Sequence, residues 1–227
     1  LVGRLTGRLA CAMAERLVEA EPWRALTIFG ERDRSFELVG DFLEGMSEEL
    51  VASGEPPGAA FWAIWNPASD WVLGPPGTQL RSSYRTHAGV PSPVMAAGFV
   101  GPYLTPIPPD WPHVEALLPT LDAWAERTQA IGAAAESLLK FCDRLSNLQI
   151  AKYALAWIER WLQRHENDSE FWGHADVANR AAAVTLRVQT EEPRPNMTDA
   201  KRIRAILAKL ADHGSLTARQ ALVAIAA

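Results

Sequence analysis

The chain has 227 residues with a formal net charge of −5, and hydrophobic residues make up 48% of it. This length can bury one large core or two smaller ones. The acidic balance argues against a protein dedicated to nucleic-acid binding. Because no apolar run approaches the roughly 18 residues of a membrane helix, we expect no membrane-spanning segment.

The two cysteines favour a reducing compartment. Cys11 and Cys142 lie far apart in the sequence, each within an apolar helical pattern. This predicts two separate buried thiols rather than a disulfide. No secretory leader is recognisable, so we expect a cytoplasmic protein. The chain begins at Leu1 within a helical pattern, and we therefore expect it to be part of a longer protein.

Residues 1–55 are predicted to form a pair of helices. The first has an apolar residue about every fourth position until Pro22: Leu5, Leu9, Met13 and Leu17. The apolar positions of the second step by three and four residues: Phe36, Val39, Leu43, Met46 and Leu50. Gly54 follows at the place of a left-handed helix cap. Residues 1–56 hold 11 acids and 6 bases, which predicts an acidic solvated face.

Residues 56–119 form a proline-rich aromatic segment with 13 of the 16 prolines and five charged residues. Proline excludes long uninterrupted helices, so we expect short ones at 58–65, 79–88 and 94–103. The segment is too aromatic for a disordered linker. We expect it to be ordered by packing, either on the flanking helices or on a partner.

Residues 120–227 are predicted to be a stack of helices. Apolar residues at alternating spacings of three and four predict one long helix over 121–145, around which the chain is organised. The next helix, 147–164, is apolar over more than half of its circumference, which indicates neighbours on two sides. Its start carries a capping-box pattern at Ser146 and Gln149.

Three more helix starts are predicted toward the C-terminus. Asp168 or Ser169 caps a helix that runs to about Val188, and Thr198 caps the next one, which ends at Gly214. A second capping-box pattern begins at Thr217. The sequence therefore predicts an all-α protein, either an irregular helical bundle or an α-solenoid-like stack, organised as 1–55, 56–119 and 120–227.

No motif in the sequence indicates catalysis. Gly74-Pro-Pro-Gly-Thr78 resembles the opening of an ATPase phosphate loop, but Gln79, Leu80 and Arg81 stand where that loop needs Gly, Lys and Ser or Thr. No serine lies in a nucleophile elbow, and neither cysteine has a recognisable local partner. We expect a protein without enzymatic activity and without a cofactor.

A cluster of histidines and acids at one predicted helix start is the best candidate for a metal site in the sequence. Its members are His165, Glu166, Asp168, Glu170, His174 and Asp176. No two histidines are four residues apart, as a shared helix face requires, and acids are expected at a helix N-terminus in any case. The sequence predicts no metal site.

The aromatic middle segment offers candidate protein-binding residues. Aromatic and arginine side chains in a region poor in other charges are typical of interface cores. These residues are Trp62, Trp65, Trp71, Arg81, Arg85 and Trp111. The competing interpretation is an aromatic core covered by long loops.

The C-terminal region gives a second hypothesis. Ile203–Thr217 resembles the first two helices of a winged-helix module, and residues 189–227 hold 6 bases and 4 acids. The helix that reads DNA would be the third, so a terminal helical hairpin that closes the stack is favoured. If the chain is instead a subunit of a nucleic-acid-binding assembly, its contacts are Arg202, Arg204, Lys209 and Arg219.

Several stretches taken in order resemble a known family. They are Phe61-Trp-Ala-Ile-Trp65, the proline-broken segment, a tryptophan-bearing helix, Lys140–Trp161 and Arg202–Ser215. Together they resemble the C-terminal helical-repeat region of bacterial STAND-type NTPases. The resemblance implies a sensor or scaffold module of a large ATPase, in some cases a defence protein, with the nucleotide site outside this chain.

Overall fold

The computed structural model describes residues 1–28, 32–73, 107–128, 132–173, 176–191 and 197–226, and every element within these ranges is helical. The all-α prediction is therefore confirmed. The chain divides into two compact units, Leu1–Thr120 and Leu121–Ala227. Residues 1–55 and the described part of 56–119 thus belong to one unit. The helices expected at 79–88 and 94–103 lie outside the described residues.

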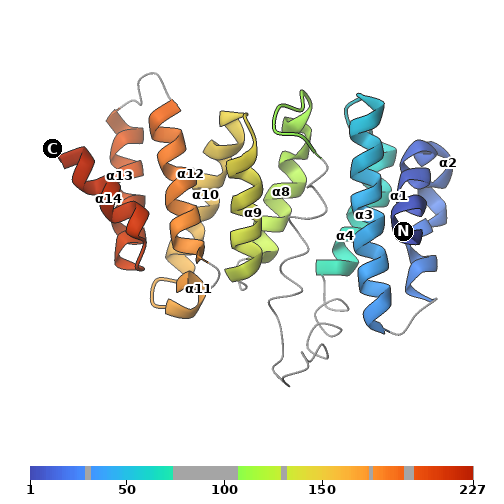
Figure 1. Cartoon of the computed structure of the whole chain (residues 1–227), viewed down its shortest axis with the longest axis horizontal. Coiled ribbons are helices and arrows are strands. Elements are labelled where there is room, and N and C mark those ends of the chain that lie inside the picture. The colour runs from blue at the N-terminus through green and yellow to red at the C-terminus, as the bar shows by residue number, and fades with distance from the viewer. Residues whose placement is uncertain (29–31, 74–106, 129–131, 174–175, 192–196, 227) are drawn as a thin grey trace. The chain divides into compact units, whose positions relative to one another are not determined.

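The first unit is built around one long helix, α3. Its elements are α1 (Val2–Ala12), α2 (Ala14–Leu17), α3 (Arg32–Ser53), α4 (Ala59–Leu73) and the short 3-10 helices η1 (Val18–Ala20), η2 (Pro22–Thr27) and η3 (Val114–Leu117). Helix α3 packs against both α1 and α4 (Figure 1). Gly54 has a φ of +70° directly after α3, which confirms the predicted cap.

Helices α1 and α3 approach backbone to backbone. Gly3 and Gly7 are buried on the contact face of α1. A Cβ atom on Gly7 would lie 2.0 Å from the carbonyl oxygen of Phe42, and one on Gly45 of α3 would lie 2.1 Å from that of Arg4. Only glycine fits such distances, because backbone atoms cannot move aside as a side chain would.

The larger apolar residues of α1 consequently point away from α3. Leu5 is 56% exposed and Leu9 is 57% exposed. The leucines of the predicted stripe therefore lie largely in solvent. Glycine allows the two backbones to approach closely, so the small-residue face of α1 makes the contact.

Helix α4 runs through a proline. The predicted short helix at 58–65 extends to Leu73 with Pro67 inside it, so the expectation that proline ends this helix is wrong. Proline removes one backbone hydrogen bond of the helix. Trp65 and Ala68 on either side of it are completely buried, and this burial offsets the loss.

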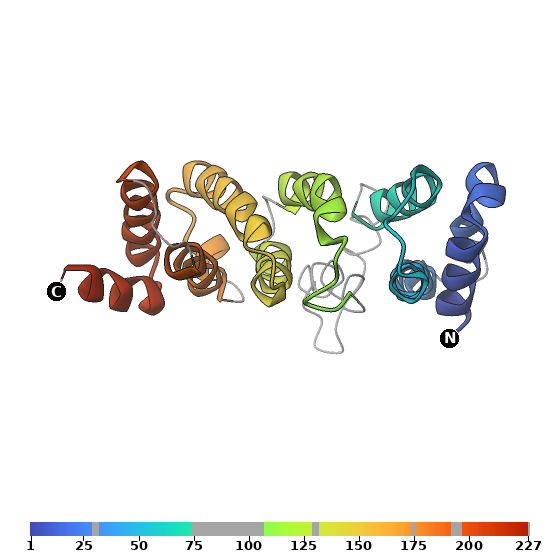
Figure 2. The same cartoon turned by 90° about the horizontal axis from the view of Figure 1, so that it is seen from above.

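The second unit is a two-layered helix stack. Its helices are α8 (Leu118–Thr128, which begins in the last residues of the first unit), α9 (Gly132–Arg144), α10 (Leu148–Arg164), α11 (Ser169–Gly173), α12 (Val177–Glu191), α13 (Met197–Asp212) and α14 (Leu216–Ala226). Helices α9, α12 and α14 form one layer, and α10 and α13 lie in the other (Figure 2). Successive long helices alternate between the layers, as in an α-solenoid.

The single helix predicted over 121–145 is two helices, α8 and α9, and that prediction is wrong. The apolar residues keep spacings of three and four across the boundary between the two helices. The sequence pattern therefore does not show that a new helix begins at Gly132, although glycine is a poor helix former. The helix predicted from 168 to 188 is likewise two helices, α11 and α12. Asp176, which precedes α12, has a φ of +68°, a conformation that no helix interior accepts.

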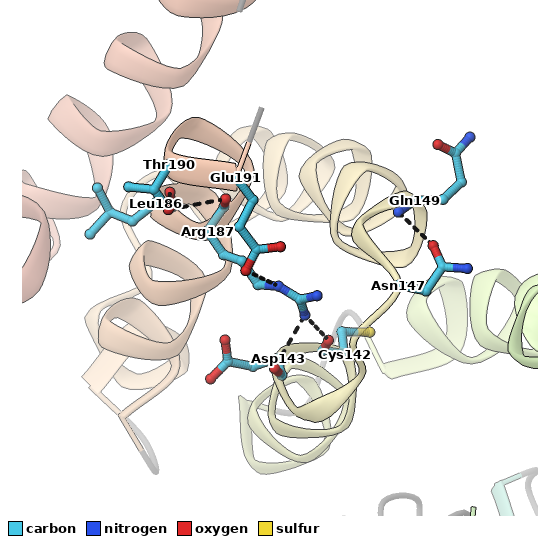
Figure 3. A network of polar contacts seen from close by, with 8 residues as sticks. All are labelled: Cys142, Asp143, Asn147, Gln149, Leu186, Arg187, Thr190 and Glu191. Atoms are coloured by element: carbon cyan, nitrogen blue, oxygen red, sulfur yellow. Dashed lines mark hydrogen bonds and ion pairs between the residues drawn. The ribbon is translucent and has the colours of Figure 1, made fainter. Parts of the chain in front are cut away.

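Two predicted caps are displaced by one or two residues. The cap of α10 is Asn147, whose side chain accepts a hydrogen bond from Gln149 N at 2.8 Å (Figure 3). The cap of α14 is Ser215, whose Oγ accepts one from Ala218 N at 3.1 Å. The prediction of Asp168 as a cap is confirmed, because its Oδ1 accepts a hydrogen bond from Phe171 N at 2.9 Å.

Arg187 of α12 joins its helix to the end of α9. Its Nη1 donates to the carbonyl oxygens of Cys142 and Asp143 at 3.1 and 3.2 Å, and its Nε pairs with Glu191 at 3.0 Å (Figure 3). The carbonyls at a helix C-terminus lack partners within the helix. The guanidinium supplies donors and a positive charge at the negative end of the helix dipole.

Asn179 makes the equivalent connection at the other end of α12. Its Oδ1 accepts hydrogen bonds from Ser215 Oγ at 2.9 Å and Thr217 N at 3.2 Å, so it satisfies the start of α14. Two buried tryptophans of α10 reach α8 in a similar way. Trp157 Nε1 donates to Asp122 at 2.8 Å, and Trp161 Nε1 donates to the carbonyl of Ala125 at 3.3 Å.

Gly7→Ala tests the close approach of α1 and α3. We expect the substitution to lower the free energy of unfolding by about 1–3 kcal/mol, because the added methyl group meets immovable backbone. Gly58→Ala is the matched control, since nothing lies within 4 Å of a Cβ there. Urea denaturation measures both, and equal effects of the two variants would contradict the close packing.

Arg187→Met tests the connection between α12 and α9. The side chain is only 11% exposed, and the variant leaves two carbonyl oxygens without this donor. We expect a loss of about 1–3 kcal/mol in thermal or urea unfolding. Arg204→Met, on an exposed position of α13, should change stability by less than about 0.5 kcal/mol. An Arg187 variant as stable as the control would refute this role.

Candidate interaction surfaces

The predicted protein-binding tryptophans divide into core and partly exposed residues. Trp65 is completely buried and Trp111 is 5% exposed, so both pack inside the first unit. Trp62 and Trp71 are half-buried. The two arginines assigned with them, Arg81 and Arg85, lie outside the described residues.

The structure places these tryptophans in aromatic contacts with one another and with other rings. Trp62 and Trp65, on the same side of α4, meet edge to face with ring centroids 6.0 Å apart. Trp71 lies 6.2 Å from Trp23 of η2. Among the residues described, the indole N–H groups of Trp23 and Trp111 have no hydrogen-bond partner. Trp62 and Trp71 keep part of their surface exposed, whereas Trp65 and Trp111 are packed in the interior.

Two of the four candidate nucleic-acid contacts have intramolecular roles. Arg202 forms a bidentate pair with Glu159 of α10, with both distances 2.7 Å, and this pairing raises the pKa of its guanidinium. Arg219 donates from Nε and Nη2 to the carbonyl oxygen of Ala211, near the end of α13. Arg204 and Lys209 are exposed on α13. The basic surface of this region is thus smaller than the sequence indicates.

The histidine and acid cluster at α11 serves folding. His165 is buried, stacks on Phe171 with centroids 3.9 Å apart, and bonds through Nδ1 to Asp168 at 2.9 Å. The Phe171 N–H and then His165 hold the pKa of Asp168 below its ordinary value. Within the described part of the chain, no three His, Cys, Asp or Glu side chains are placed to hold a metal ion. His174 of this cluster lies outside that part.

His213 lies at the end of α13 against the same cluster. Its ring stacks on Trp172 at 4.9 Å, and the Trp172 indole donates to the carbonyl oxygen of His165 at 2.9 Å. Burial lowers the pKa of His213, and nearby Lys209 lowers it further, while Asp212 and Glu166 act in the opposite direction. The folded protein therefore favours the neutral imidazole.

The two cysteines are free thiols. Burial, with a smaller effect of Glu49, raises the pKa of Cys11 to about 11. Cys142 is completely buried, which raises its pKa further. Neither thiol has the lowered pKa that a reactive cysteine requires.

The sequence reasoning missed an apolar surface on α1 and the cavity beside it. The exposed apolar side chains of α1 are Val2, Leu5 and Leu9, and we call these three residues the α1 leucine face. A cavity of about 600 Å³ lies beyond the C-terminal end of α1, where α2, α3 and α4 also contribute to its wall. The spacing of Gly3 and Gly7 was the available signal, because it marks the opposite face of α1 as the buried one.

No family model, no curated protein and no solved structure matches this chain. The resemblance to STAND-type NTPases therefore stays a prediction. Among the described residues, no helix combines the length and the apolar character that crossing a membrane requires.

We expect His213 to make the second unit less stable in mild acid. Because folding lowers its pKa from 6.5, its contribution to stability is complete above that value and is lost as the pH falls through the lowered pKa. We expect the urea midpoint to drop between about pH 7.5 and about pH 5, and to drop less in His213→Gln. Asp168 loses its contribution only at lower pH, below its ordinary value of 3.8. An identical pH profile for the variant would exclude His213 as the cause.

Proposed function

We propose that this chain is a non-enzymatic, cytoplasmic protein-interaction module. It acts as a sensor or scaffold in a larger bacterial protein or complex, and antiviral defence is the setting that the family resemblance implies. The observation that carries the proposal is the α1 leucine face. Val2 is 63% exposed, and Leu5 and Leu9 are each more than half exposed. A row of large apolar side chains left in water on a folded helix is typical of a binding surface.

The contrast with α10 supports this interpretation. Both helices carry apolar residues on more than one side. On α10 these sides are covered, and Trp157, Ile158 and Trp161 are at most 1% exposed. On α1 only the small-residue side is covered. A helix that is apolar on two sides normally has neighbours on both, so the leucine face of α1 has the composition of a contact surface. Trp62 and Trp71 extend the exposed apolar area of the same unit.

The alternative function, as a helical subunit of a nucleic-acid-binding assembly, receives less support. Arg202 and Arg219 are engaged within the chain. The whole chain also carries a net charge of −5, which opposes association with phosphates. We therefore keep this function as an outcome of the experiment below.

A pull-down from nuclease-treated native lysate tests the protein-interaction function. The baits are the full chain, the double variant Leu5→Gln/Leu9→Gln, and Leu216→Gln on α14. Leu216 is a matched control because it is 62% exposed on a helix of the other unit. We expect one or more proteins to be captured by the wild type and by the control. The double variant should capture at least about tenfold less, because it loses two apolar contacts.

Circular dichroism must show equal helicity for the three baits. If the double variant captures the same proteins in the same amounts, the leucine face is not the binding surface and the proposal fails. A parallel pull-down omits the nuclease. If material is captured only without nuclease, Arg204 and Lys209 become the residues to substitute, and the nucleoprotein alternative replaces the proposal.

A further inference from the structure

We infer that the α1 leucine face and the adjoining cavity form one groove that binds an amphipathic helix carrying basic residues, supplied by a protein partner. The inference rests on the proposed interaction function and names the partner's chemistry. Its starting point is that the two features are continuous along α1.

The register of α1 makes them continuous. Leu5, Leu9 and Ala12 are separated by four and three residues, which places them on one side of a helix. Ala12 is exposed and also lines the cavity. The apolar row therefore continues to the mouth of the cavity.

The cavity has an apolar wall and charged groups at its edge. Met13, Leu50 and Phe61 supply large apolar side chains from the α1–α2 junction, α3 and α4. Exposed Glu15 lines it as well, and the remaining charged lining residues are Arg16 and Glu49. A volume of about 600 Å³ can accept more than one large side chain of a partner, as binding pockets do.

Charge along this edge selects a basic partner. Arg4 pairs with both Glu44 and Glu48, and Arg8 pairs with Glu49 at 3.1 Å. Three carboxylates thus share two guanidinium groups.

The same surplus appears over the whole region. Residues 1–56 hold 11 acids and 6 bases, which is as negative as the net charge of the entire chain. Lysine or arginine beside the apolar face of a docking helix would complement this surplus, while acidic residues there would be repelled.

An amphipathic helix is the occupant that the shape favours. The leucine face is a row on a helix rather than a sheet edge, so it offers no backbone groups for an added strand. Residues spaced by three and four on a partner helix can follow the same row. Their basic neighbours can pair with exposed Glu15 at the cavity edge, and a large side chain can enter the cavity.

Binding of two synthetic peptides tests the inference. Both are amphipathic helices of about 18 residues, long enough to form a helix, with leucine on one face and alanine at neutral positions. One carries lysine at its polar positions and the other carries glutamate. We expect fluorescence anisotropy to show binding of the lysine peptide and at least about tenfold weaker binding of the glutamate peptide at low salt.

Three variants of the full chain locate the binding. Leu5→Gln/Leu9→Gln should abolish binding of the lysine peptide, and Glu15→Gln should reduce the preference for lysine over glutamate. Leu216→Gln should bind as the wild type does. Cys11 gives an independent readout, because it lines the cavity. Its alkylation, followed above about pH 9 since burial raises its pKa, should slow when the lysine peptide is bound.

Three results would overturn the inference. The first is equal affinity for the two peptides, or no affinity for either. The second is binding without any protection of Cys11. The third is a wild-type dimer in sedimentation that Leu5→Gln/Leu9→Gln dissociates, because a second copy would then be the occupant. The protein-interaction function fails separately, through unchanged capture of lysate proteins by the double variant.

Discussion

Helix α12 has neighbours on almost every side, and this constraint shapes the second unit. It packs against α9, α10, α11, α13 and α14. Burial of a polar side chain without a partner costs more free energy than a hydrogen bond gains, so the partners of the polar residues matter on a helix this enclosed. Its apolar residues are accordingly small, with Ala181 and Ala182 completely buried.

The polar residues of α12 then set how its neighbours lie. Asn179 holds the start of α14, and Arg187 holds the end of α9. Arg180 lies 3.5 Å from Glu136, a carboxylate that is itself only 8% exposed. Each of these side chains satisfies backbone or charge on a different helix. The apolar residues drive the packing of the helices, and the polar residues determine how the packed helices are positioned relative to α12.

The sequence predicted which regions are helical better than it predicted where helices end. Apolar spacing indicates a buried face, and the same spacing continues from α8 into α9, so the two were expected as one helix. The observed caps differ from the predicted ones by a residue or two because Ser, Asn and Thr side chains all accept backbone hydrogen bonds. Ser146 and Asn147, for example, are adjacent and can both cap a helix. The cap at Gly54 was predictable because the left-handed conformation that ends a helix strongly favours glycine.

The candidate surfaces were predictable only in part, because pairing depends on residues distant in the chain. Nothing near Arg202 in the sequence indicates that Glu159 will neutralise it. Trp62 and Trp65 are three residues apart on one helix, yet one keeps exposed area and the other has none. On α1 the leucines form the regular apolar stripe in the sequence, whereas the glycines make the contact with α3. Hydrophobicity alone does not distinguish a face that packs within the chain from a face left for a partner.

The two faces of α1 should tolerate substitution very differently. Gly3 and Gly7 face a backbone that leaves no room for another atom, so these positions accept no other residue without moving a helix. Leu5 and Leu9 project from the same turns with more than half of each side chain exposed. Related chains can therefore exchange the residues of the outer face freely and keep the inner face unchanged. Under the proposed interaction function, such a helix can acquire a new binding specificity over time without a new fold.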